Sequence, residues 1–497
     1  MDIGFLNQEI TYYQRSEYGS TAFEAVSETV VPDVMPDICE IVCAAGTALL
    51  RSKVFSDGVM TVSGSIQTQV LYLAETDQSP KKLELEIPFD FSRRTDASDE
   101  SLFSVCVRLA YVDARAINPR KLGVRCELCA DISRYDAESL VVACEQAPDD
   151  TADLCLKKDL VAADLVSGVW EKTFIVTDSF PLSGAGDGDC ELLCKTVSLY
   201  GEEVRFVGTK AILKGIVQTD LLWRTAGEEI ASGAFRSEFS QILDIGELEQ
   251  PSAELILSLT GAFFETPYAS DDSVVNAEFH VLAQVVCSQR TEIVCISDVY
   301  SNHALLTPRF CEPRLLSTAE RESRRDSMRG VIETPFAVRE ILQISAAPGI
   351  LTKTEAEYAC PINVRVLLRD DSGALHGLVR SFAAKWPLSA DGSVSELPLN
   401  VFSRELSASP AASGVEVRLS AAAEFLQMRD IRIEPLESAE LDESVRIDPS
   451  TFPSITVLPA KEADLWALAK RCHSTVALIE EANRDLGASV LLIPRAR

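Results

Sequence analysis

Hydrophobic and polar residues alternate along much of this chain with a period of two. Between Met60 and Tyr72 every second residue is apolar or small, whereas the residues between them are mainly serine, threonine and glutamine. This pattern predicts a β-strand with one face in a hydrophobic core. Gly64 interrupts the apolar face of a run that is longer than a typical strand. We therefore expect a bulge or bend near Gly64, where another strand approaches closely.

The same pattern occurs twice with related residues. Residues 39–72 align without a gap on residues 190–223, which indicates a duplicated unit. The distance between the copies exceeds the roughly 20 to 50 residues of solenoid repeats, so each copy should have a core of its own. Eight residues of the first copy are identical to those aligned with them: Cys39, Glu40, Cys43, Phe55, Gly64, Gln67, Thr68 and Leu71.

A third copy keeps the alternation but few of the residues. Residues 356–368 align on residues 60–72, with Ile362 and Val366 among the few identities. A turn signal and a second alternating run follow each of the three strands, which predicts hairpins. Further alternation supplies enough strands for a β-sandwich in every copy. The second hairpin strands are expected at 83–89, 230–239 and 375–382, and the additional strands at 103–111, 122–132, 255–261, 277–287 and 415–425.

Segments without alternation suggest the domain boundaries. Residues 145–170 and 312–330 are expected to be connectors or short helices. The acidic, proline-containing stretch 434–453 is expected to be an extended tether, because it has little apolar surface. We predict β domains at 1–150, 151–311 and 312–440, an acidic linker at 441–453 and a small module at 454–497.

The hydrophobic pattern changes after the linker. Residues 455–458 and 490–494 predict two strands, with two amphipathic helices between them. Thr475 stands where it can cap the second helix. The order is therefore β-α-α-β. Leu465, Leu468, Ala469 and Cys472 form the apolar face of the first helix, and Val476 and Ile479 that of the second.

Composition excludes several classes of partner. The 497 residues are 46% hydrophobic, enough to bury a core in each of three or four domains. A net charge of -30 repels phosphates and anionic lipids, so we expect no nucleic-acid partner and instead a protein or a neutral ligand. We expect no signal peptide and no transmembrane segment. The 14 cysteines lie in apolar segments, which predicts free thiols in a reducing cytosol.

Motifs for chemistry are missing from the sequence. It contains no G-x-S-x-G, P-loop or H-E-x-x-H pattern, and its four histidines are dispersed. We therefore expect a protein that is not an enzyme, with no catalytic residues, no metal and no cofactor. Residues 184–189 are interpreted as a flexible turn rather than a phosphate or calcium loop. The alternative is an enzyme whose pocket gathers residues that are far apart in the sequence.

Closely spaced cysteines have two interpretations. Cys126 and Cys129 have C-x-x-C spacing but lie in an alternating run, where residues three apart point to opposite faces of a strand. Cys39 and Cys43 can share a face, as can their counterparts Cys190 and Cys194, so a metal or redox pair is the alternative there. We expect all of them to pack as small apolar residues.

The last module resembles a LysM domain. The matching segments are 456–459 (Thr-Val-Leu-Pro), 465–471 (Leu-Trp-Ala-Leu-Ala-Lys-Arg), Thr475, Asn483 and 491–494 (Leu-Leu-Ile-Pro). LysM modules usually continue with Gly-Asp-Thr after the first proline, whereas residues 460–464 here are Ala-Lys-Glu-Ala-Asp. The resemblance implies a module that binds either a protein or a polymer of N-acetylglucosamine such as peptidoglycan.

The whole chain resembles the SPOCS-domain spore-envelope proteins of spore-forming Firmicutes. The shared features are tandem β-rich units with a strand like that at residues 62–72, a hairpin that ends in residues 87–89, and a C-terminal LysM module, as in the SipL-type members. The resemblance implies a scaffold for assembly of the spore coat, located in the mother-cell cytoplasm at the forespore surface. It also implies that the LysM module docks on the morphogenetic ATPase of the coat basement layer.

Residues for this docking can be proposed from the module. Trp466 and Lys470 lie one helical turn apart and can present an aromatic anchor with a cation beside it. The alternative is that Trp466 is half buried and that Leu465 packs in the core with Leu468, Val476 and Ile479. We expect the partner-binding residues to be Leu465, Trp466, Lys470 and Asn483.

Overall fold

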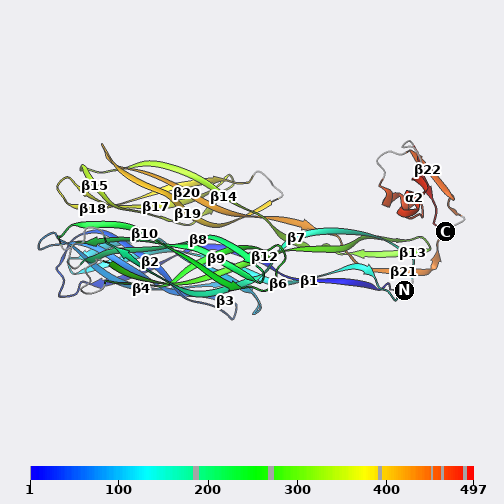
Figure 1. The fold of residues 1–497 in the computed structure, drawn as a ribbon, viewed down its shortest axis with the longest axis horizontal. Helices are drawn as coiled ribbons and strands as arrows, with labels where there is room; N and C mark the ends of the chain where they lie inside the picture. The colour runs from blue at the N-terminus through cyan, green and yellow to red at the C-terminus, as the bar shows by residue number, and fades with distance from the viewer. Residues whose placement is uncertain are drawn as a thin grey trace.

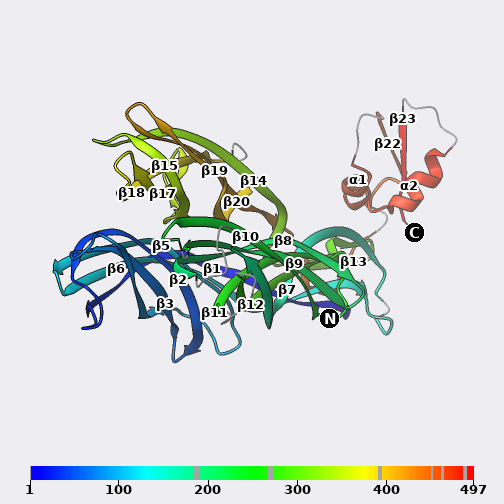
Figure 2. The same ribbon diagram turned by 60° about the vertical axis from the view of Figure 1, so that its left-hand side comes forward.

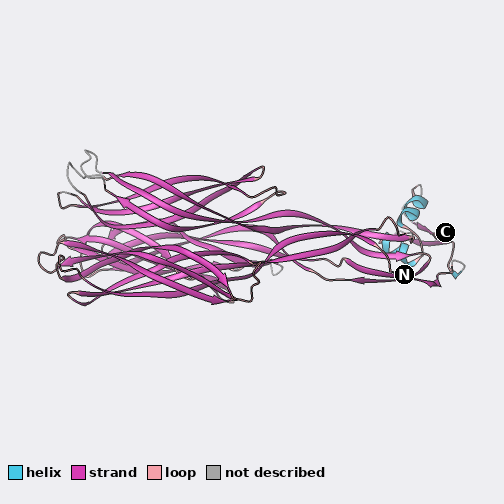
Figure 3. Cartoon of the chain, turned by 90° about the horizontal axis from the view of Figure 1, so that it is seen from below, coloured by secondary structure: helices cyan, strands magenta, loops and turns pink. Residues whose placement is uncertain are grey.

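The molecule is elongated and built mainly of antiparallel strands (Figure 1). Three β-sandwiches lie together at one end, and their longest strands continue into a narrow stalk that carries both termini and the C-terminal module (Figure 3). The mainly β fold expected from the alternation is thus confirmed. The computed structural model describes residues 2–150, 152–182, 190–225, 227–266, 274–389, 394–448, 451–459, 464–484 and 490–496.

The first unit is a sandwich of two layers. Sheet β2-β3-β4 packs on strands β1-β6-β5, and alternate residues of both layers fill the space between them. Val62 and Ile66 of β3 and Leu128 of β6, for example, have no exposed surface. Strands β1-β6-β5 are one half of a six-stranded sheet that continues into the second unit through the pairing of Tyr13 with Val166. The strands are β1 (Phe5–Val30), β2 (Ile38–Ser56), β3 (Val59–Ala74), β4 (Pro80–Arg94), β5 (Leu102–Asn118) and β6 (Lys121–Gln146).

The second and third units repeat this strand order (Figure 2). In the second unit β8-β9-β10 packs on β7-β12-β11, and in the third β15-β17-β18 packs on β14-β20-β19. The second unit contains β7 (Leu154–Pro181), β8 (Glu191–Val207), β9 (Lys210–Arg224), β10 (Ile230–Asp244), β11 (Ser252–Glu265) and β12 (Val274–Ser301). The third contains β14 (Arg314–Glu333), β15 (Val338–Pro348), β16 (Thr352–Lys353, a short extension beside β17), β17 (Glu357–Asp370), β18 (Leu375–Pro387), β19 (Val394–Ala411) and β20 (Gly414–Arg432).

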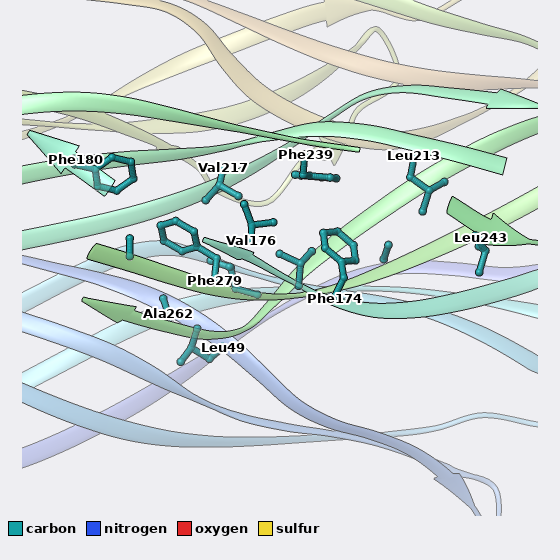
Figure 4. Close-up of a cluster of buried hydrophobic side chains, with 14 of the residues drawn as sticks. Leu49, Phe174, Val176, Phe180, Leu213, Val217, Phe239, Leu243, Ala262 and Phe279 are labelled. Carbon is teal, nitrogen blue, oxygen red and sulfur yellow. The ribbon is translucent and has the colours of Figure 1, made fainter. Parts of the chain in front are cut away.

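Aromatic and branched side chains fill the second sandwich (Figure 4). Phe174 of β7 and Phe239 of β10 come from opposite sheets and meet with ring centroids 5.1 Å apart. Leu49 belongs to the first unit but packs into this core. The first unit therefore contributes a side chain to the core of the second.

The predicted irregularity at Gly64 is present in both of the first two units. Gly64 pairs with Phe89, and its counterpart Gly215 pairs with Phe239, whose rings occupy the space that a Cβ would need. Opposite each glycine, the neighbouring strand carries a β-bulge. The expected close approach is thus confirmed, whereas the bulge lies in the neighbouring strand and not in the long strand that carries the glycine. Glycine is required because an aromatic ring and a backbone carbonyl fill the place of a Cβ.

Two expected connectors are strands instead. Most of residues 145–170 and 312–330 belongs to β6, β7 and β14. Their alternation is weak because both faces of these strands contact other parts of the molecule or carry charged side chains. The prediction of connectors or short helices there was wrong.

The stalk is made of the outer ends of the first and last strands of each unit. β1 pairs with β6 from Phe5 to Val30, and β7 pairs with β12 along its whole length. In the third unit the ribbon is interrupted, and it continues as β13 (Ala304–Phe310) paired with β21 (Leu436–Arg446). Pro313 and Pro435 lie in the interruption, where proline cannot donate to the ladder.

This pairing corrects the predicted tether and two of the boundaries. Residues 436–446 of the expected tether, including the first part of the 441–453 linker, form a strand. Leu436, Ala439 and Leu441 are buried against the other stalk strands. These few side chains supply enough apolar surface for a strand, although the segment as a whole is acidic. The boundary at 311 separates β13 from its partner β21, and the boundary at 440 cuts through β21.

The three units meet through equivalent β-bulges. The extra residue of the bulge is Val42 in β2, Leu193 in β8 and Leu342 in β15. Each bulge lies opposite the end of its partner strand, close to the hairpin turn. All three belong to one hydrophobic cluster between the units. Each bulge turns an apolar side chain out of its own sandwich. The residues opposite the bulges, Leu71, Leu222 and Leu367, belong to the same cluster.

Contacts around this cluster run in a cycle. The fourth strand of each unit touches the second strand of the next: β4 contacts β8, β10 contacts β15, and β18 contacts β2. At two of these places a small residue lets the bulge approach. Ser232 donates a hydrogen bond to the Leu342 carbonyl, and Gly377 lies directly against the Val42 carbonyl.

We predict that Gly377→Ala destabilises the protein. The added Cβ would overlap the carbonyl oxygen of Val42, which is backbone and cannot move aside without shifting the bulge. Overpacking of this kind costs about 1 to 3 kcal/mol, measurable as a loss in the free energy of unfolding by urea. Gly123→Ala is the control, because its Cβ would meet only ordinary contacts with Ile117. Equal stability of the two variants would contradict the prediction.

Candidate functional site

Metal or redox chemistry is the alternative interpretation of the closely spaced cysteines. All 14 cysteines are free thiols, and among the described residues no group of three or more His, Cys, Asp or Glu side chains is placed to hold a metal ion. Burial raises the pKa of Cys43 to about 12 and the pKa of Cys126 and of Cys129 to about 11. These thiols are therefore protonated near neutral pH and are poor nucleophiles.

The cysteine pairs do not form sites. Cys126 faces the core of the first sandwich, whereas Cys129 points to the opposite side of the sheet, toward Arg108, as expected. Cys39 is exposed and accepts a hydrogen bond from Gln78, but Cys43 is buried beside the Val42 bulge. The bulge breaks the alternation between them. Cys43 lies instead in the same cluster as Cys194, its counterpart in the second unit.

An open hollow of about 450 Å³ in the first unit is lined by polar side chains. Glu17 in this hollow is paired with Arg93 and lies 3.7 Å from Arg134, and Thr95 donates a hydrogen bond of 2.9 Å to it. These polar groups form their hydrogen bonds and ion pairs with one another and so join β1, β4 and β6. Because their role is to link the strands, we consider the C-terminal module the better candidate site.

The module has the predicted β-α-α-β order. It consists of β22 (Ile455–Pro459), α1 (Leu465–Arg471), α2 (Val476–Asn483) and β23 (Val490–Pro494), with β22 and β23 antiparallel. Asp464 caps α1 by accepting hydrogen bonds from the backbone of Trp466 and Ala467. Thr475 caps α2 through the backbone of Leu478, as the sequence predicts.

Two of the four proposed partner-binding residues hold the module together. Leu465 packs at the edge of a core formed by Ala469, Ile479 and Ile493. Asn483 donates to the carbonyls of Ile479 and Leu492 and accepts from the Leu492 amide. Its side chain therefore joins the end of α2 to β23, and all three of these bonds are internal to the module.

The other two residues contact the stalk. The indole N–H of Trp466 donates to Oδ2 of Asp298 at 2.8 Å, and the Lys470 ammonium lies 2.7 Å from Oδ1 of the same carboxylate. Asp298 belongs to β12, next to an irregularity in its pairing with β7. The expected juxtaposition of Trp466 and Lys470 on one side of α1 is therefore present, but an acidic residue of this chain occupies it.

Tyr300 and Asn302 complete the contact. The Tyr300 ring meets the Trp466 ring edge-on with centroids 4.9 Å apart, and its hydroxyl donates to the Ser474 carbonyl at 2.9 Å. Asn302 donates to the same carbonyl at 3.1 Å. Tyr300 is only 6% exposed and belongs to the core cluster of the module. We call Asp298, Tyr300 and Asn302 the module seat.

The charge of Asp298 depends on this contact. Burial disfavours the carboxylate, but hydrogen bonds from Lys470 and Trp466 outweigh burial and hold the pKa of Asp298 below its ordinary value. The ionised form of Asp298 is thus the form that holds the module.

Sequence reasoning missed the module seat. Asp298, Tyr300 and Asn302 are more than 160 residues away from Trp466 and lie at the end of a strand with no motif. The departure from the LysM pattern at 460–463 and the interpretation of 184–189 as a flexible turn both lie outside the described residues.

Comparison with protein families and with curated sequences gave no match. None of the protein-family models matches this chain, and none of the curated proteins is similar to it in sequence. In the described part of the chain, the helices are too short to cross a membrane. The function must therefore be inferred from the residues and the fold.

We predict that Asp298→Asn loosens the module. Loss of a charge-assisted pair costs about 1.5 to 3 kcal/mol, so amide hydrogen exchange in residues 465–471 should become at least about tenfold faster. Asp153→Asn is the matched control, because Asp153 lies in the same part of the stalk but pairs with His303. Unchanged exchange in Asp298→Asn would show that the seat does not hold the module.

The same contact should depend on pH. Because the pKa of Asp298 is lowered in the folded protein, its contribution is fully present above the ordinary aspartate value of about 3.9 and is lost as the pH falls through the lower folded value. Exchange in residues 465–471, corrected for its intrinsic pH dependence, should rise in that acid range. The Asp298→Asn variant should not show this rise.

Proposed function

We propose that this protein is a non-enzymatic scaffold of spore-envelope assembly whose C-terminal LysM-like module docks on a coat morphogenetic protein. The observation that carries the proposal is the combination of three sandwiches of one topology with a β-α-α-β module that matches the LysM pattern. This is the domain order of the SPOCS-type proteins that the sequence resembles.

The shape of the molecule suits a spacer with one specific end. The first two units send their first and last strands into the stalk, and β13 pairs with β21 there beside the third unit, so the body is held by long ladders and not by flexible linkers. The module lies at the stalk end, away from the sandwiches (Figure 1). Such a body can bind partners along its sides while the module supplies a local attachment.

The charge favours a protein partner over nucleic acid or an anionic membrane, because a net charge of -30 repels both. The proposed place of action is the mother-cell cytoplasm at the forespore surface. The proposed partner is the ATPase of the coat basement layer.

The first test is deletion of residues 452–497. We expect the remaining protein to fold and to lose its binding to the basement-layer ATPase in a pull-down assay. The full-length protein should also be sedimented with peptidoglycan. Retention on peptidoglycan together with unchanged ATPase binding by the truncated protein would favour the glycan-binding alternative.

A second test separates partner contact from the module seat. Trp466→Ala and Asp298→Ala both remove the indole–carboxylate bond of 2.8 Å. If Trp466 is a partner anchor, only Trp466→Ala should weaken the complex, by about tenfold or more, whereas Asp298→Ala should leave its affinity equal or higher. Circular dichroism and titration calorimetry are sufficient to measure folding and affinity. An equal loss in both variants would indicate that the seated module is what the partner recognises.

A further inference from the structure

The first two units cover each other's outer faces, meaning the faces of β1-β6-β5 and β7-β12-β11 that point away from their own cores. Gln284 lies on the outer face of β12 and has no exposed surface. Its amide donates to the Val105 carbonyl of β5 at 2.6 Å and accepts from the Val105 amide at 3.0 Å. Leu282, two residues away, packs against the core of the first unit. Unit one thus covers unit two.

The reverse contact also exists. On the outer face of the first unit, the Cys106 thiol donates to the Leu257 carbonyl of β11. Arg15, whose side chain is 6% exposed, is paired with Glu254 of the same strand. The edge strand of each unit therefore lies on the outer face of the other. Within the chain, the outer face of one unit is therefore buried by another copy of the unit.

The third unit has no such cover. In the described part of the chain, the strand outside the unit that packs extensively on β14-β20-β19 is β7, near the stalk junction at Leu315. Beyond that junction the charged side chains of this face are exposed or half-buried, whereas the smaller Ser420 and Ala422 between them are buried. We call this side of the unit the third outer face; it is represented by Arg321, Arg325 and Arg329 of β14 and by Arg418 and Glu424 of β20.

Charge sets this face apart from the rest of an acidic molecule. Arg321, Arg325 and Arg329 occur at every fourth position and point outward, since the residues between them on the inner side line the sandwich. Arg321 pairs with Glu424, and Arg329 and Arg418 share Glu416. Among the described residues Arg325 has no carboxylate partner.

These features favour a second copy of the chain as the occupant. Two molecules of charge -30 repel each other over most of their surfaces, so they can approach only where positive and negative groups are balanced. The third outer face carries both signs and is complementary to itself, as an isologous contact requires. A two-fold axis parallel to the strands, between β14 and β20, places Arg321 and Arg325 of one copy on either side of Glu424 of the other.

We propose that the third outer face is a homodimer interface, in which two chains cover each other's third unit as the first and second units cover each other within one chain. The dimer places two stalks and two modules in one particle. This inference does not depend on the identity of the partner that the module binds.

The test is sedimentation equilibrium of the full-length protein from about 1 to about 100 µM, a range in which weak specific interfaces associate. We expect a reversible monomer–dimer equilibrium. Arg325→Glu should raise the dimer dissociation constant by at least about tenfold, because the change occurs twice in each dimer. Arg115→Glu is the control, since it makes the same charge change on an exposed residue of β5.

Ser327→Trp gives an independent check. Ser327 is exposed between Arg325 and Arg329, so the substitution adds bulk to this face without changing its charge. It should weaken the dimer by steric overlap, and both variants should keep the wild-type circular dichroism. A wild-type protein that stays monomeric throughout the range would overturn the proposal. A dimer that neither variant weakens would overturn it as well.

Discussion

The meeting of three β-bulges in one buried cluster is the contact on which the arrangement of the repeats depends. A regular strand would turn Val42, Leu193 and Leu342 along the usual alternation, and the sandwiches would have no common apolar surface. The extra residue re-aims each side chain toward the other units. Because backbone and side chains are close-packed there, as at Gly377 against the Val42 carbonyl, the units fit together in one way.

The stalk follows from the same arrangement. Once the sandwiches are fixed side by side, the free ends of their first and last strands leave in a common direction and bury residues such as Ile10, Leu165 and Leu315 against one another. The ribbon ends bring β12 to the point where the module begins. Asp298 and Tyr300 can hold Trp466 only because the stalk carries them there.

The sequence predicted the strands better than their partners. Alternation located the hairpins and the close approach at Gly64, because period-two burial is a local property of one strand. It failed for β7, β14 and β21, whose faces are buried by other units or interrupted by charges. The module seat could not be found from sequence, since its pairing with Trp466 arises from tertiary placement alone. Asn483 was recognised by resemblance, and the structure gives it an internal role.

The ladder that joins Phe5 to Gln146 has a consequence for synthesis of the chain. The first strand of each repeat cannot form its ladder until almost the whole repeat has left the ribosome, because it pairs with the last strand of that repeat. Closing such distant pairs is slow, and an unpaired long strand is open to incorrect association meanwhile. Hairpins such as β3 with β4 can form early. The strand pairs of the stalk are therefore the last to form, after the local hairpins of all three repeats.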